Sequence, residues 1–98
     1  MIRRLRTAVT EYLAADRALA EVSIRDIEAG VFDETPEYDA ANDRVLDAER
    51  AMPWTVYFFA DWLSYRRNRD VFERLWEAEE QAEWDAVDAA AEREERES

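Results

Sequence analysis

The chain has 98 residues, contains neither cysteine nor histidine, and carries a formal net charge of −12 at pH 7. The missing residue types exclude disulfides, zinc fingers, thiol nucleophiles and any catalysis or metal binding that needs an imidazole. The excess of carboxylates argues against nucleic acid as a direct partner, and a chain of this length suits a single domain spanning residues 1–98.

Few residues interrupt the backbone, because glycine occurs once and proline twice, so long helices are expected. The first predicted helix runs from about Ile2 to Ala29, and Gly30 is well placed to end it. A turn of about 100° per residue gathers one broad apolar face on this helix. The face comprises Ile2, Leu5, Ala8, Val9, Tyr12, Leu13, Leu19, Ala20, Val22 and Ile27.

The second predicted helix follows Thr35, whose side-chain oxygen can cap it, with Pro36 at the first helical position. It runs to about Ala51 and has a narrow apolar stripe at heptad-like spacing. The stripe comprises Tyr38, Ala41, Val45, Ala48 and Met52.

The third predicted helix, Trp54 to Arg67, starts beyond Pro53 and is apolar almost all round. A helix with that pattern lies in the middle of a bundle or beneath a partner. We expect one of its two aromatic sides to face the core of the same chain and the other to face a second copy or a partner. One side carries Trp54, Phe58 and Tyr65, and the other carries Phe59 and Leu63.

The sequence leaves open whether residues 68–70 form a turn or continue the helix. A turn is favoured by Asp70 and Glu73, which are spaced as a capping box. The last predicted helix runs from Val71 to about Arg93, and the acidic segment 92–98 is expected to fray. The apolar face of this helix comprises Val71, Phe72, Leu75, Trp76, Ala82, Ala86, Val87 and Ala90.

These elements predict an all-α fold, an antiparallel bundle of three to four helices of which two are long. The outer ends of the long helices would have little to pack on within one subunit, so we also predict a homodimer. The longest apolar run, residues 54–60, is far shorter than the roughly 20 residues of a membrane span. No signal peptide is visible, and we expect a cytoplasmic protein with no membrane partner.

Charge is unevenly distributed along the chain. Residues 1–7 and 50–69 each carry about +3, whereas residues 8–49 and 70–98 each carry about −9. Such a surface can serve solubility, can reflect adaptation to high salt, or can imitate the phosphate backbone of a nucleic acid. For the last possibility the residues expected to form the acidic face are Glu73, Glu77, Glu80, Asp88 and Glu95.

The thirteen basic residues are all arginine, which indicates a GC-rich coding source such as an actinobacterium, one of its phages or a haloarchaeon. Trp, Tyr and Arg are the residues most enriched at the energetic centres of protein interfaces. Trp84 is of interest because it lies alone on the polar side of the last helix. The residues expected to bind a partner protein are Trp54, Phe58, Tyr65, Arg66, Arg67, Arg69 and Trp84.

Four carboxylates fall within apolar faces, namely Asp16, Asp61, Glu79 and Glu83. Because a buried carboxylate is costly unless it is paired, we expect partners for them among Arg44, Arg66 and tyrosine hydroxyls. An alternative is an all-oxygen Mg²⁺ or Mn²⁺ site. The segment Glu79-Glu80-Gln81-Ala82-Glu83 resembles the EExxE half of the metal-binding motif in the MazG-type nucleotide pyrophosphohydrolases, although the ExxD half is absent.

We therefore expect a small acidic helical protein-binding module, an adaptor, inhibitor or regulator that acts by occluding a partner protein. A phage gene would be one fitting source. The alternative function is an acidic nucleic-acid mimic that blocks a DNA- or RNA-binding protein, and a carboxylate-dependent metal hydrolase is a remote third. The preferred interpretation implies no enzyme activity and no cofactor.

Overall fold

The computed structural model describes residues 2–97, and this part of the chain forms four helices and no strand. They are α1 (Ile2–Glu28), α2 (Pro36–Arg50), α3 (Trp54–Arg67) and α4 (Arg69–Glu97). The predicted all-α fold with two long helices is confirmed. Only α4 differs clearly from its predicted bounds, because it includes residues 92–97 of the predicted tail, where glutamate and arginine both favour helix.

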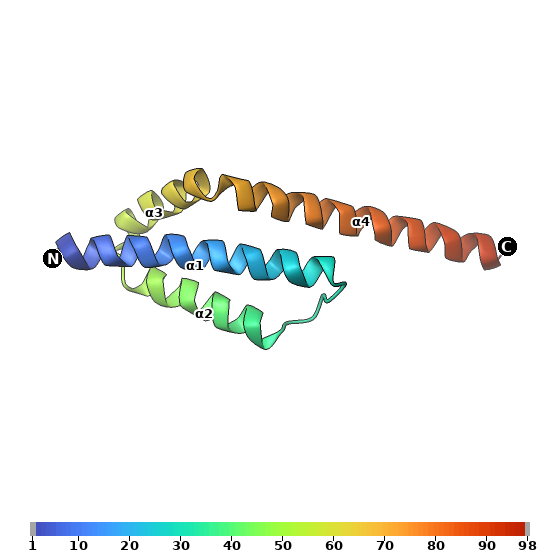
Figure 1. The fold of residues 1–98 in the computed structure, drawn as a ribbon, viewed down its shortest axis with the longest axis horizontal. Helices are drawn as coiled ribbons and strands as arrows, with labels where there is room; N and C mark the ends of the chain where they lie inside the picture. The colour runs from blue at the N-terminus through green and yellow to red at the C-terminus, as the bar shows by residue number, and fades with distance from the viewer. Residues whose placement is uncertain (1, 98) are drawn as a thin grey trace.

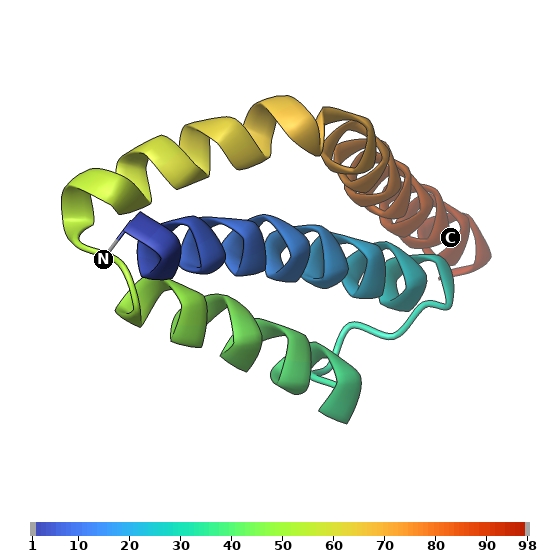
Figure 2. The same ribbon diagram turned by 60° about the vertical axis from the view of Figure 1, so that its left-hand side comes forward.

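α1 is the central helix of the molecule and contacts each of the other three. α2 packs on one side of α1, and α3 and α4 pack on the opposite side (Figures 1 and 2). α2 runs antiparallel to α1, whereas α3 and α4 follow one another around a bend and run in the same general direction as α1 (Figure 1). Every helix therefore reaches the core through α1.

The connection from α1 to α2 is fixed by local hydrogen bonds. Gly30 has a φ of +73°, the left-handed conformation that glycine adopts without strain, and this residue ends the helix as predicted. Thr35 caps α2, because its Oγ1 accepts a hydrogen bond from the Tyr38 backbone N–H at 3.1 Å. The same hydroxyl donates to Asp26 Oδ2 at 2.9 Å, so the buried Asp26 joins the end of α1 to the start of α2.

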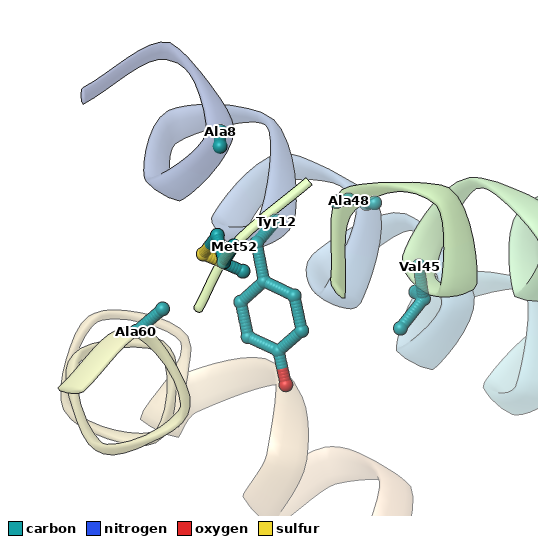
Figure 3. Close-up of a cluster of buried hydrophobic side chains, with 7 residues drawn as sticks. Ala8, Tyr12, Val45, Ala48, Met52 and Ala60 are labelled. Atoms are coloured by element: carbon teal, nitrogen blue, oxygen red, sulfur yellow. The ribbon is translucent and has the colours of Figure 1, made fainter. Parts of the chain in front are cut away.

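The core is built mainly from small side chains. Figure 3 shows the larger cluster, in which Tyr12 of α1 lies among residues of α2, α3 and the turn between them. Tyr12 is only 3% exposed. The predicted α2 stripe is confirmed, since all of its members except Tyr38 are buried. The buried members of the cluster are Ala8, Tyr12, Ala15, Val45, Ala48, Met52 and Ala60.

A bend at Asn68 separates α3 from α4 and decides the question that the sequence left open for residues 68–70. Asn68 is buried, and its side-chain amide donates to the Leu13 carbonyl at 3.1 Å and to Ser64 Oγ at 3.0 Å. The break involves this one residue, and Asp70 lies inside the first turn of α4. Two hydrogen bonds of 3.1 Å join Asp70 to Arg17 and hold the start of α4 against α1.

The outer half of α4, residues 83–97, is exposed along its whole length. It projects past the end of α1 (Figure 1), and the molecule measures 67 × 26 × 19 Å. Ala86, Val87 and Ala90 continue the apolar face of α4 but are exposed, which agrees with the expectation that the outer end of this long helix has little to pack on within one subunit. Whether a second copy covers this region stays a prediction.

Within residues 2–97, none of the helices combines the length and the apolar character required to cross a membrane.

Candidate functional site

α3 packs against α1 through small side chains, and this places its large aromatic residues on the outside. Ala60 and Ser64 are fully buried. Because these residues are short, the two helices can lie close together, and the bulky residues on either side of them project past α1. The expectation that one aromatic side of this helix faces the core is therefore wrong: Trp54, Phe58 and Phe59, which come from both sides, are each more than half exposed.

The exposed aromatic residues of α3 and the start of α4 form one continuous surface, which we call the aromatic face. The Trp54 and Phe58 rings meet edge to face with centroids 5.9 Å apart. Tyr65 of α3 lies beside Trp76 of α4, with ring centroids 6.1 Å apart, so the surface continues across the bend. The aromatic face comprises Trp54 (72% exposed), Phe58 (63%), Trp62 (52%), Tyr65 (46%) and Trp76 (49%).

An open cleft of about 590 Å³ lies within the aromatic face, between α3 and α4. Its walls include Trp62, Tyr65 and Trp76, and it also reaches Asp16 of α1 and Asp61 of α3. The cleft lies where α3 and α4 meet at the bend that follows α3 (Figure 2). The cleft therefore combines aromatic walls with two carboxylates.

Hydroxyl groups bind both of these carboxylates. Ser64 Oγ donates a hydrogen bond to Asp16 Oδ2 at 2.6 Å, and Tyr12 Oη donates one to Asp61 Oδ1 at 3.0 Å. Asp61 itself is exposed, and Asp16 is half-buried. The predicted tyrosine partner is thus confirmed for Asp61. Arg44 does not pair with either acid, because it lies 3.6 Å from Glu11.

The environment of Asp16 disfavours its charged form. Burial raises the pKa of this carboxyl above its ordinary value, and the neighbouring negative charge of Asp61 raises it further. The hydrogen bond from Ser64 acts in the opposite direction and lowers the pKa. Burial is the largest of these effects, so the carboxylate of Asp16 lacks full compensation for its desolvation.

The three arginines predicted to bind a partner lie in different environments. The guanidinium carbon of Arg66 lies 5.1 Å from the ring centroid of Trp62, at the edge of the aromatic face. Arg69 pairs with Glu73 on α4 at 2.9 Å. Arg67 lines a second groove of about 520 Å³ between α1 and α3, with Phe59 and other apolar residues. Only Arg66 therefore belongs to the aromatic face.

Trp84 and the residues of the predicted acidic face all lie on α4. Trp84 is 59% exposed and follows Trp76 by eight residues, or about 12 Å of helix axis. It lies in the outer half of α4, so it is not part of the aromatic face. The predicted acidic residues are all exposed: Glu73, Glu77, Glu80, Asp88 and Glu95.

The four candidate metal ligands are not gathered at one place. Asp16 and Asp61 line the same cleft, whereas Glu79 lines a different pocket beside Ser23 and Glu83 lies in the exposed outer half of α4. Among residues 2–97, no group of three or more aspartate, glutamate, histidine or cysteine residues could hold a metal ion.

Two residues of the aromatic face were missing from the sequence-based site. They are Trp62, which belongs to the segment 54–67 that is apolar almost all round, and Trp76, which belongs to the apolar face of the last predicted helix. The local signal was present, because both are tryptophans beside residues already proposed. Their shared surface depends on the bend at Asn68, and the sequence left open whether residues 68–70 form a turn or continue the helix.

Searches with this chain find no match among protein-family models, curated proteins or solved structures.

Proposed function

We propose that this protein is a small acidic protein-binding module, an adaptor, inhibitor or regulator that occludes a partner protein with its aromatic face. The observation that carries the proposal is the exposure of five neighbouring aromatic side chains, each between 46% and 72%. Scattered apolar residues are normal on protein surfaces, but a contiguous patch marks an interaction site. Tryptophan and tyrosine are also the residues that contribute most at the centres of protein interfaces.

The arrangement of charge supports the same function. The aromatic face is bordered by Arg66 and by the acids of α4, and a typical interface has an apolar centre with a polar rim. The net charge of −12 would speed the approach of a basic partner and oppose acidic ones. The cytoplasmic location and the phage origin expected from the sequence stay predictions.

Two tryptophans of α4 provide a matched test. Trp76 belongs to the aromatic face and Trp84 does not, although the two are similarly exposed on one helix. The full chain is immobilised, proteins from the native host are captured and identified by mass spectrometry, and binding of the identified partner is then measured by calorimetry. We expect Trp76→Ser to weaken binding at least tenfold and Trp84→Ser to leave it within twofold, with unchanged circular dichroism for both. If Trp76→Ser binds as well as the parent protein, the proposal is wrong.

A second candidate function is an acidic mimic of nucleic acid that blocks a DNA- or RNA-binding protein. One structural observation favours it, because the outer half of α4 is a projecting rod with carboxylates exposed on its surface. DNA carries one charge per about 1.7 Å of axis, and residues 70–98, with a net charge of about −9, offer a sparser line of the same sign. In this case Glu80→Gln combined with Asp88→Asn should weaken partner binding, and binding should fall steeply with added salt, whereas Trp76→Ser should have little effect.

A further inference from the structure

The cleft in the aromatic face contains two carboxylates that lack a cationic partner. In the described part of the chain, neither Asp16 nor Asp61 forms an ion pair. Each receives one hydrogen bond from a hydroxyl, at Asp16 Oδ2 and Asp61 Oδ1, and the second oxygen of each receives none. An ionised carboxylate can accept about four hydrogen bonds, so both groups keep capacity for a further donor.

The nearby arginines are engaged elsewhere. Arg66 lies over the ring of Trp62, and Arg17 donates to Asp70 and pairs with Glu21. A half-buried acid is ordinarily paired with a cation, because desolvating an unpaired charge is costly. Burial does raise the pKa of Asp16, and the charge of Asp61 raises it further. A positive charge placed between the two acids would favour the charged form of Asp16 and so offset both effects.

The walls of the cleft suit one kind of cation in particular. Trp62, Tyr65 and Trp76 present aromatic rings beside the carboxylates, in a space of about 590 Å³. A guanidinium is planar, stacks on aromatic rings and donates to carboxylates in pairs, whereas an ammonium is a compact and strongly hydrated charge. Arg66 already stacks in this way on Trp62 at the edge of the same face.

We propose that the partner protein inserts an arginine side chain into this cleft, where its guanidinium lies between Asp16 and Asp61 and against the aromatic walls. The inference rests on the proposed function, since it names the chemistry of the partner at the same surface. The inserted arginine belongs to a protein other than this one. An arginine from a second copy of this chain, such as one of the basic N-terminal residues 3–6, is an outcome that the experiment must separate.

The first experiment uses two short peptides that differ only in charge. Acetyl-Gly-Arg-Gly-amide and its citrulline counterpart, which replaces the guanidinium with a neutral urea of the same shape, are titrated into the ¹⁵N-labelled full chain. The four indole N–H signals report position: Trp62 and Trp76 line the cleft, while Trp54 and Trp84 serve as internal references. We expect saturable shifts at Trp62 and Trp76 with the arginine peptide and at least tenfold weaker binding of the citrulline peptide.

Neutral variants of the two acids make the test specific. Asp16→Asn keeps the side-chain shape and still accepts the hydrogen bond from Ser64, and Asp61→Asn can likewise accept from Tyr12. Each should weaken binding of the arginine peptide at least threefold, whereas Asp88→Asn, which removes an exposed charge on the outer half of α4, should not. Equal binding of the two peptides, or binding insensitive to both cleft variants, overturns the inference.

The remaining outcomes separate this inference from the proposed function. If the two peptides bind equally but Trp76→Ser still abolishes capture of the natural partner, the aromatic face is the docking surface and only the proposal of an inserted arginine is wrong. If the arginine peptide binds in the cleft but capture is insensitive to Trp76→Ser, the proposed function fails. Self-association in analytical ultracentrifugation that Asp16→Asn and Asp61→Asn both abolish would assign the arginine to a second copy and overturn the inference as stated.

Discussion

Tyr12 offers the sharpest test of how this small core is held together. It is the largest side chain in the main buried cluster, and its ring meets that of Tyr57 edge to face at 5.7 Å. Its hydroxyl donates a hydrogen bond to the exposed carboxylate of Asp61. Two substitutions separate these contributions: Tyr12→Phe removes the hydroxyl alone, and Tyr12→Ala removes the ring as well.

The expected magnitudes differ because the two changes have different physical costs. A hydrogen bond to a charged group contributes about 1.5–3 kcal/mol, and water can replace the donor at the exposed Asp61, so Tyr12→Phe should cost about 1–1.5 kcal/mol. Tyr12→Ala leaves a cavity in a ring of mostly small side chains and should cost about 3–5 kcal/mol. A domain of this size is stable by only about 5–15 kcal/mol in total, so the alanine variant should be near the limit of folding.

Urea unfolding followed by circular dichroism at 222 nm measures both changes. With a slope of about 1–3 kcal/mol per molar urea, Tyr12→Phe should lower the midpoint by roughly 0.3–1.5 M. Tyr65→Phe is the matched control, because this tyrosine is half exposed and lies outside the core, and its midpoint should not move. If Tyr12→Phe and Tyr12→Ala were equally destabilising, or if the former had no effect, the division of roles between ring and hydroxyl would be refuted.

Tyr12 should also make the protein less stable at alkaline pH. Burial above all, and then the negative charge of Asp16, raise the pKa of the Tyr12 hydroxyl above its ordinary value of 10.0. The folded state therefore holds this proton more tightly than the unfolded state, and the resulting stabilisation is present below about pH 10 and is lost as the pH rises through the folded-state pKa. In Tyr12→Phe, the free energy of unfolding should decrease less steeply above pH 10 than in the parent protein. The decrease that remains is expected from Tyr57, because burial raises the pKa of this residue as well.

Four further predictions can be checked by the same unfolding measurements. Asp16→Asn should leave the protein as stable or more stable at pH 7, because the raised pKa of Asp16 means that its charged form opposes folding; lower stability would contradict this. Gly30→Ala should cost about 1 kcal/mol through its φ of +73° alone, since no atom lies within 4 Å of the added methyl group, and a neutral result would show that this turn adjusts. Breaking the exposed ion pair with Arg17→Gln or Asp70→Asn should cause a small loss of unfolding free energy, and this loss should disappear in 1 M salt. It should also disappear at low pH, because Asp70, whose pKa is lowered by Arg17, then takes up its proton in the folded state. Deleting residues 86–98 should reduce the helical signal with little change in the urea midpoint, and a large drop would mean that a second copy or another contact covers the outer half of α4.

The helices could be predicted from the sequence because the signals that define them are local. The apolar stripe of α2 from Ala41 to Met52 was identified by spacing alone, and Thr35 and Gly30 act as the cap and the stop that their chemistry suggested. The candidate site was predicted only in part. Trp54, Phe58, Tyr65 and Arg66 do belong to one surface, but their neighbours from α4 could not be assigned without the bend.

Periodicity identifies an apolar face of a helix but not what covers that face. Ala86 and Val87 continue the stripe of α4 and are exposed, as the length of that helix led us to expect, because α1 ends at Glu28. Phe59 lies on a side that could have been core, yet Ala60 and Ser64 make the contact with α1 instead. In both cases burial depends on the length and the position of a different helix.

The sequence by itself determined an acidic all-helical chain, the limits of most of its helices and the types of residue available for binding. Those properties follow from backbone propensity, side-chain spacing and charge, which act over a few residues. The tertiary structure alone decided that small residues make the core contacts, that the aromatic residues remain outside, and that Asp16 and Asp61 from two helices share one cleft. These depend on how closely helices distant in sequence can approach, and on the single buried asparagine, Asn68, that sets the direction of α4.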